Sequence, residues 1–184
     1  MQRLSIFVII LSACLFSNAQ EIDAKAFNSI TFENILLNKI NTFRSESGVN
    51  PLVNNLNLKK AAVDQSDFLK KNKELTHSQP LKGKRTVQER LLQYVSPTNF
   101  AVGENIARTY ILIPSYNYQR DGSTTLTEAK TYEEAANYML SSWISSKSHR
   151  ENLLNSKYVL SGIASYFNSS YKTLTVVQVF ARLH

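Results

Sequence analysis

Two segments near the end of the chain constrain the fold most, because they are rich in β-branched and aromatic residues. Residues 159–167 and 171–180 each have the length of one strand, and the Asn168-Ser169-Ser170 sequence between them is typical of a turn. The earlier part of the chain carries helical patterns instead. Helices first and strands last indicate an α+β fold with an antiparallel sheet.

Apolar residues at helical spacing predict two helices in the first half of the chain. The first covers residues 31–47, where Gly48 is placed to end it and Pro51 blocks its continuation. The second covers residues 57–71. Each presents one apolar stripe, formed by Phe32, Ile35, Leu36, Ile40 and Phe43 in the first helix and by Leu58, Ala61, Ala62, Gln65, Phe68 and Leu69 in the second.

Three later segments have the spacing of a capping box, which predicts helix starts. Thr86 with Glu89 opens a short helix that ends near residue 94. Thr131 with Glu134 opens a longer helix, and Ser148 with Glu151 opens a short helical turn. Trp143 lies in the apolar stripe of the longer helix, so we expect it in the core.

Residues 108–130 are polar and contain residues that interrupt regular structure, among them Pro114, Asp121 and Gly122. This composition predicts a long surface loop, a kind of segment that often has a specific task.

The first nineteen residues read as an export signal. Arg3 supplies a positive start, residues 4–11 are almost entirely apolar, and residues 17–19 are small. We expect a mature chain that begins at Gln20, with an extension over 20–30 and one domain over 31–184. No later apolar run is long enough to span a bilayer. The protein is therefore expected to be secreted or periplasmic.

Cys14, the only cysteine of the chain, offers an alternative. Residues 11–14 have the form of a lipid-attachment site, but the apolar run continues past the cysteine, which favours export without an anchor. Removal of Cys14 would leave no disulfide.

The formal net charge is +7, and the densest patch of positive charge lies at residues 82–85. This patch is interpreted as a solvated loop rather than a nucleic-acid site.

Two histidines are the residues most able to carry chemistry, because no HExxH, GxSxG, P-loop or GxGxxG motif is present. His77 and His149 could hold a divalent metal and leave a position open. Alternatively, Glu89 or Glu104 could raise the pKa of a neighbouring histidine and form an acid–base pair. Each residue also has a structural reading. Glu89 could complete a capping box, Glu104 could bond the backbone near Gly103, and His149 could lie in solvent.

Several motifs in a fixed order together resemble the bacterial branch of the CAP superfamily (cysteine-rich secretory, antigen 5, pathogenesis-related). The match covers roughly residues 33–182. Its main parts are Gly103-Glu104-Asn105-Ile106-Ala107, Trp143 followed by His149-Arg150-Glu151-Asn152-Leu153-Leu154, Gly162-Ile163-Ala164 and Val177-Gln178-Val179-Phe180-Ala181.

The resemblance implies a three-layer α-β-α sandwich with a central antiparallel sheet. It also implies a cleft that contains His77, Glu89, Glu104 and His149, in which the two histidines can hold zinc or another divalent ion. Members are mostly secreted, and many bind lipids, sterols or proteins.

Three functions follow as alternatives, and the ligand and oligomeric state stay open in all of them. The first is a non-enzymatic extracellular binding module with a metal, a small molecule or a lipid in the cleft. The second is a metal-assisted hydrolase of peptides or cell-envelope polymers, in which Glu104 would activate water. The third is an adhesive surface protein that acts through residues 108–130.

Overall fold

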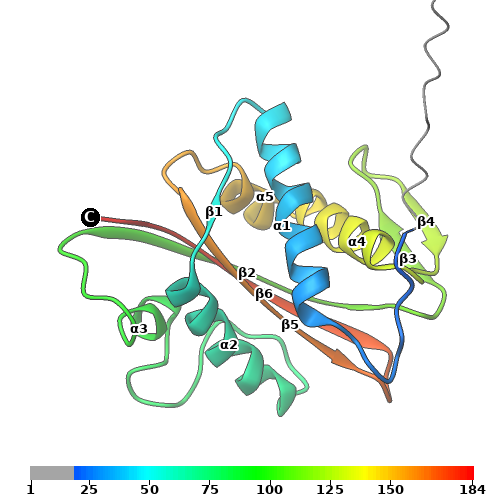
Figure 1. Cartoon of the computed structure of the whole chain (residues 1–184), viewed down its shortest axis with the longest axis horizontal. Helices are drawn as coiled ribbons and strands as arrows, with labels where there is room; N and C mark the ends of the chain where they lie inside the picture. The colour runs from blue at the N-terminus through cyan, green and yellow to red at the C-terminus, as the bar shows by residue number, and fades with distance from the viewer. Residues whose placement is uncertain (1–18) are drawn as a thin grey trace, which may run out of the picture.

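The computed structural model describes residues 19–184 and contains five helices and six strands within that range (Figure 1). The predicted export signal, apart from Ala19, and Cys14 lie outside the described residues. The elements in chain order are α1 (Ser29–Glu46), β1 (Val53–Asn54), α2 (Leu56–Lys70), α3 (Val87–Leu91), β2 (Phe100–Tyr110), β3 (Ser115–Tyr118), β4 (Thr124–Thr127), α4 (Tyr132–Ser145), α5 (Lys147–Leu153), β5 (Leu160–Asn168) and β6 (Thr173–Leu183).

The central sheet has the strand order β1-β5-β6-β2. The two predicted C-terminal strands are confirmed as β5 and β6, which pair antiparallel. β2 then pairs antiparallel with β6 along its full length, from Phe100 opposite Leu183 to Tyr110 opposite Thr173. The short β1 runs parallel to β5. The predicted antiparallel sheet is therefore correct for its three long strands, and β1 makes the complete sheet mixed.

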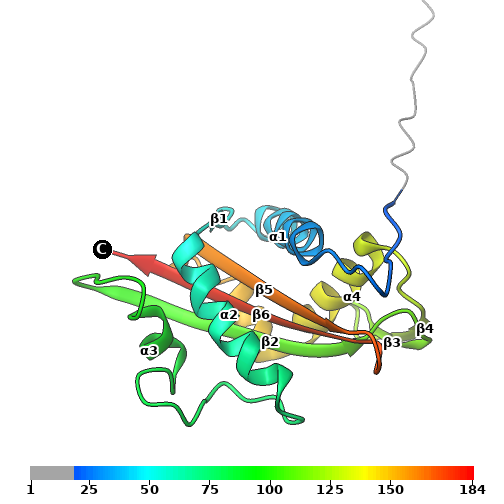
Figure 2. The ribbon, with the colours of Figure 1, turned by 60° about the horizontal axis from the view of Figure 1, so that its bottom comes forward.

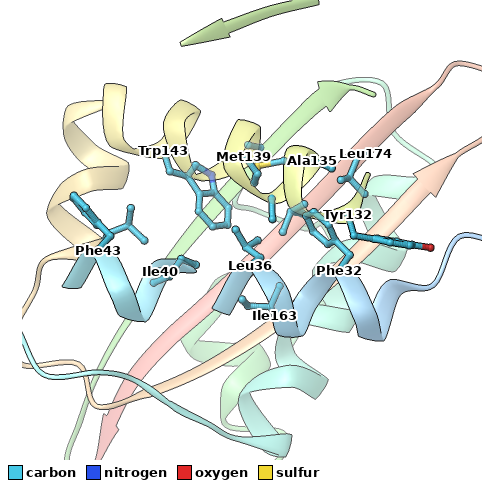
Figure 3. Packing of buried hydrophobic residues seen from close by; sticks show 14 of the residues in the cluster. Phe32, Leu36, Ile40, Phe43, Tyr132, Ala135, Met139, Trp143, Ile163 and Leu174 are labelled. Carbon is cyan, nitrogen blue, oxygen red and sulfur yellow. The ribbon is translucent and has the colours of Figure 1, made fainter. Parts of the chain in front are cut away.

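Helices cover both faces of this sheet, which confirms the three-layer architecture (Figure 2). One face packs against α1, α4 and α5, and the other packs against α2 and α3. Residues of β6 alternate between the two layers, since Val176 belongs to the first core and Val177 to the second. Trp143 is fully buried between α1 and α4 near Leu36, so the prediction that it belongs to the core is confirmed (Figure 3).

The helix starts show which capping predictions hold. The capping box of Thr131 and Glu134 is present in full. At α3 only half of the box forms: the Thr86 side chain accepts from the Glu89 N–H, but the Glu89 carboxylate accepts from the Arg85 N–H. The predicted cap at Ser148 is wrong, because α5 begins at Lys147 and its N-cap is Ser146, which is also the C-cap of α4.

The segment 108–130 is more ordered than a long loop, which corrects the sequence-based prediction. Its first residues belong to β2, and β3 and β4 form an antiparallel hairpin with Tyr116 opposite Leu126. Gly122 has a φ of +86° in the connecting turn, a conformation that glycine adopts readily. Tyr138 of α4 donates from its hydroxyl to the Ser115 hydroxyl at 2.8 Å, which attaches the hairpin to the domain.

Two glycines mark places where the layers approach closely. A Cβ on Gly162 of β5 would lie 2.1 Å from the Lys59 nitrogen, so only glycine lets α2 pack this near the sheet. A Cβ on Gly103 of β2 would lie 2.4 Å from the Tyr158 hydroxyl. The glycines of two sequence motifs are thus required by packing, and the second of them sits beside Glu104.

The N-terminal extension is joined to the domain. The Ile22 N–H donates to the Lys130 carbonyl, and the Ile22 side chain is buried. Asn28 caps α1 by accepting from the Thr31 N–H. Within residues 19–184, no helix combines the length and apolar character needed to cross a membrane.

Candidate functional site

His77 lies on the loop between α2 and α3, and its side chain is 59% exposed. The loop is held against α2 by the buried Gln65, whose side-chain amide donates to the Thr76 carbonyl. Gln79 in turn donates to the Gln65 side chain at 2.9 Å. These bonds fix the backbone on both sides of His77, so the position of the ring is set by the fold.

Glu104 lies in the middle of β2 and has both carboxylate oxygens engaged. Its Oε1 lies 2.8 Å from His77 Nδ1, and its Oε2 accepts from Arg90 Nη2 at 2.6 Å. The side chains of Glu104 and Arg90 are almost completely buried. A buried carboxylate needs such a partner, because removal of an ion from water is costly unless its charge is compensated.

The bond to Glu104 determines which nitrogen His77 presents to solvent. A carboxylate oxygen only accepts, so Nδ1 of His77 carries the proton and donates it. In the neutral ring the lone pair is then on Nε2, on the opposite side of the imidazole. This arrangement is common for metal-binding histidines, whose second nitrogen donates to a carboxylate.

His149 comes from the other helical layer, on α5, and is positioned by two asparagines. The Asn105 side chain donates to the His149 carbonyl at 3.0 Å, and Asn152 donates to Asn105 Oδ1 at 2.9 Å. Asn105 follows Glu104 on β2, so its side chain points to the opposite face of the sheet. Because β2 is an outer strand, the two layers can meet beyond its edge.

The His149 ring is half-buried next to Trp143, with 6.5 Å between the ring centroids. Burial, and secondarily the charge of nearby His77, lower the pKa of His149 below its ordinary value of 6.5. The rise in pKa expected from a neighbouring carboxylate is therefore not found at His149. Among the described residues, its Nδ1 is buried and has no hydrogen-bond partner.

The predicted four-residue set is assembled only in part. Glu104 contacts His77 directly, and His77 and His149 are near enough for one charge to affect the other. Glu89 takes its hydrogen bond from the Arg85 N–H at the start of α3. Within residues 19–184, no hydrogen bond connects Glu89 to either histidine.

Two imidazoles are the side chains of this region that could donate to a divalent cation. In the part of the chain that is described, no group of three or more His, Cys, Asp or Glu side chains is arranged to hold a metal. Two neutral histidines would leave further coordination positions to water or a ligand. Glu104 would act from outside the coordination sphere by orienting His77.

Sequence reasoning missed three residues of this site. Arg90 compensates the charge of Glu104, and Asn105 and Asn152 connect β2 to α5. All three occur in the motifs quoted above or beside Glu89. Arg90 did have a sequence signal, because it lies next to the apolar Leu91 in a short helix. An arginine that is buried beside such a residue needs a partner for its charge.

Comparison with known proteins gives a family match over most of the chain. The model of the cysteine-rich secretory protein (CAP) family matches residues 37–180. No curated protein sequence matches the chain.

Three solved structures share the fold. An outer surface protein from Borrelia burgdorferi is 20% identical, with 90% of this chain and 99% of that chain covered and a TM-score of 0.64. An extracellular SCP-domain protein from Bacillus anthracis is 21% identical, with coverages of 84% and 41% and a TM-score of 0.61. A cysteine-rich secretory protein from Staphylococcus aureus is 19% identical, with coverages of 84% and 39% and a TM-score of 0.53. This chain thus spans about two fifths of the last two proteins.

Proposed function

The chain belongs to the cysteine-rich secretory protein (CAP) family, and we propose that it is an exported binding protein in which His77 and His149 together bind a divalent cation. The first nineteen residues support export, as do the extracellular protein from Bacillus anthracis and the outer surface protein from Borrelia burgdorferi, which have the same fold. The cation would join the two helical layers at the edge of β2.

One observation carries the metal proposal: both oxygens of Glu104 are engaged, one by Arg90 and one by His77. This fixes the His77 ring with Nε2 directed away from the carboxylate. The lowered pKa of His149 keeps that second imidazole neutral at pH 7, which is the form that binds metal. In the proposed site, Nε2 of His77 and the His149 imidazole donate to the same cation.

The same observation favours binding over hydrolysis. A general base needs a carboxylate that can reach a water molecule and accept its proton. The Glu104 carboxylate is almost completely buried, and both of its oxygens are already engaged, one by Arg90 and one by His77, so it is not placed to reach a water molecule. We therefore place Glu104 as a positioning residue and assign no reaction to the site.

Zinc binding tests this proposal. Titration calorimetry of the chain from Gln20 should give one zinc per molecule, and His77→Ala or His149→Ala should each remove most of the affinity. The double variant should add little, because the two ligands act as one unit. His184→Ala is the matched control, since this exposed terminal side chain is not part of the proposed site. Equal zinc binding by the wild type and the double variant would exclude the site.

Glu104→Gln separates positioning from ligation. The amide keeps the size of the side chain but gives His77 a weaker acceptor, so zinc affinity should fall by about 10–100-fold, as for other residues that orient a metal ligand. If Glu104 itself bound the metal, the loss would match that of His77→Ala. Turnover of a peptide or cell-envelope polymer that requires Glu104 would instead support the hydrolase.

Export has its own test. N-terminal sequencing of secreted protein should begin at Gln20, whereas a lipidated Cys14 in the membrane fraction would establish the anchored alternative. Native mass spectrometry of the same material would identify a bound cation, lipid or sterol-like molecule directly.

A further inference from the structure

A second candidate site lies away from the histidines, where α2, β2 and the β5–β6 turn come together. A groove of about 430 Å³ is located there. We call it the Lys/Tyr groove. The residues that define it are Lys70, Lys71, Lys73, Arg108, Tyr110, Tyr166 and Tyr171.

The groove is strongly basic, because four of its lining residues are cations and none is a carboxylate. Arg108 forms part of its wall and is held in place: Nε donates to Thr175 Oγ1 at 2.8 Å, and Nη1 donates to the Lys73 carbonyl at 2.7 Å. Nη2 donates to carbonyls at the end of α2. Arg108 thereby offsets the partial negative charge at that helix end.

The lysines then supply the charge that a ligand would meet. Lys70 is paired with Asp67 and lies over the Tyr166 ring. Lys71 and Lys73 are exposed, and neither forms an ion pair within residues 19–184. The two unpaired ammonium groups, next to the groove wall that contains Arg108, attract anions. Because both lysines are exposed, this attraction weakens as the salt concentration rises.

Exposed tyrosines extend the groove in one direction. Tyr171 is 73% exposed at the β5–β6 turn, and Tyr110 is 51% exposed at the end of β2. A second hollow of about 360 Å³ shares Arg108 and Tyr110 with the groove and continues onto β3, where Tyr116 and Tyr118 are also exposed. The second hollow extends the binding surface from β2 onto β3, which suits a chain-like ligand better than a compact one.

We propose that the Lys/Tyr groove binds an anionic polysaccharide. Lys71 and Lys73 would pair with carboxylate, sulfate or phosphate groups of the ligand. Exposed tyrosines offer flat apolar faces for sugar rings and hydroxyl groups for hydrogen bonds, a combination of apolar body and polar end that is frequent at binding surfaces. Neutral polar groups from Asn72, Asn168 and Thr173 complete the lining and match the many hydroxyls of a sugar chain.

A single-stranded nucleic acid would use the same kinds of residue, so the experiment must separate the two ligands. The probes are a fluorescent heparin octasaccharide, a neutral dextran oligosaccharide of equal length and a charge-matched oligo(dT), measured by fluorescence polarisation at 0.15 M salt. We expect binding of the heparin fragment, no binding of dextran and weaker binding of oligo(dT). Tighter binding of oligo(dT) than of heparin would overturn the assignment.

Matched variants separate the groove from overall charge. Lys71→Gln with Lys73→Gln should weaken heparin binding at least tenfold, and Tyr110→Ala with Tyr171→Ala should also weaken it. Lys147→Gln with Lys157→Gln removes the same charge from exposed positions outside the groove and should change affinity less than twofold. An equal loss in this control, or no binding of heparin by the folded wild type, would refute the proposal.

The two proposed sites can fail independently. The double variant His77→Ala, His149→Ala should keep its affinity for heparin, and the groove variants should keep their zinc stoichiometry. Unchanged far-ultraviolet circular dichroism and thermal midpoints establish that each variant is folded before its binding is compared.

Discussion

Replacement of Arg90 by Met tests the charge pairing on which the histidine site depends. Arg90 is fully buried, and its guanidinium is 2.6 Å from Glu104, whose side chain is 2% exposed. Loss of one partner from a buried ion pair leaves an uncompensated charge and costs about 3–5 kcal/mol. Met has a similar length and no charge, so little of this loss should come from a cavity.

The free energy of unfolding can be measured with urea, by fluorescence of Trp143, the single tryptophan of the chain. Arg90→Met should lower it by about 3–5 kcal/mol. Arg85→Met is the matched control, because Arg85 is exposed at the start of the same helix and its replacement should cost less than about 0.5 kcal/mol.

A second substitution provides the decisive comparison. If the cost comes from the unpaired carboxylate, then Arg90→Met with Glu104→Gln should be more stable than Arg90→Met alone, because the buried charge is gone. If the free energy of unfolding of the double variant is instead lower than that of the wild type by the sum of the two single losses, the reasoning about a buried ion pair is refuted. Zinc affinity should fall in Arg90→Met too, because Glu104 loses the partner that holds its carboxylate in place against His77.

Two further predictions concern Trp143 and the His149 beside it. Trp143→Ala should cost about 3–5 kcal/mol, from lost transfer free energy and the cavity left between α1 and α4; a thermal midpoint within a degree of the wild type would contradict its burial. His149 has a lowered pKa, so the unfolded chain binds its proton more readily, and stability should fall as pH decreases below about 6.5. A urea midpoint that falls equally in wild type and His149→Asn would disprove this contribution of His149.

The helices could be predicted from the sequence because their patterns are strong and local. The stripe from Phe32 to Phe43 places α1 within two residues of its observed start, and the Thr131 capping box marks the start of α4. The Ser148 pattern failed for an equally local reason. Ser146 is both the C-cap of α4 and the N-cap of α5, and its carbonyl already accepts from the Arg150 N–H, so the junction between the helices sets the start of α5.

The sequence of β2, FAVGENIARTY, carries no clear strand pattern because it is rich in small and polar residues. Such strands form when their neighbours supply the pairing, and β6 pairs with β2 over all eleven of its residues. The β3–β4 hairpin did carry a local signal, since Asp121-Gly122 between short alternating segments is typical of a hairpin turn. The family resemblance brought His77, Glu104 and His149 into one region, whereas the role of Arg90 depends on a contact between distant segments.

β2 explains how two sites can share one small domain without disturbing each other. Glu104 and Arg108 are four residues apart on this strand, so their side chains point to the same face and their backbones are separated by about 13 Å. At one site Glu104 is bonded to both Arg90 and His77. At the other site Arg108 donates to a carbonyl in the last turn of α2. Glu104 is compensated by Arg90, and Arg108 is held by hydrogen bonds to the Thr175 hydroxyl and to backbone carbonyls. Because the strand between them is paired along its full length with β6, a change at one end has no flexible route to the other. Substitutions at the two sites should therefore be additive in stability, as expected for residues that share no partner.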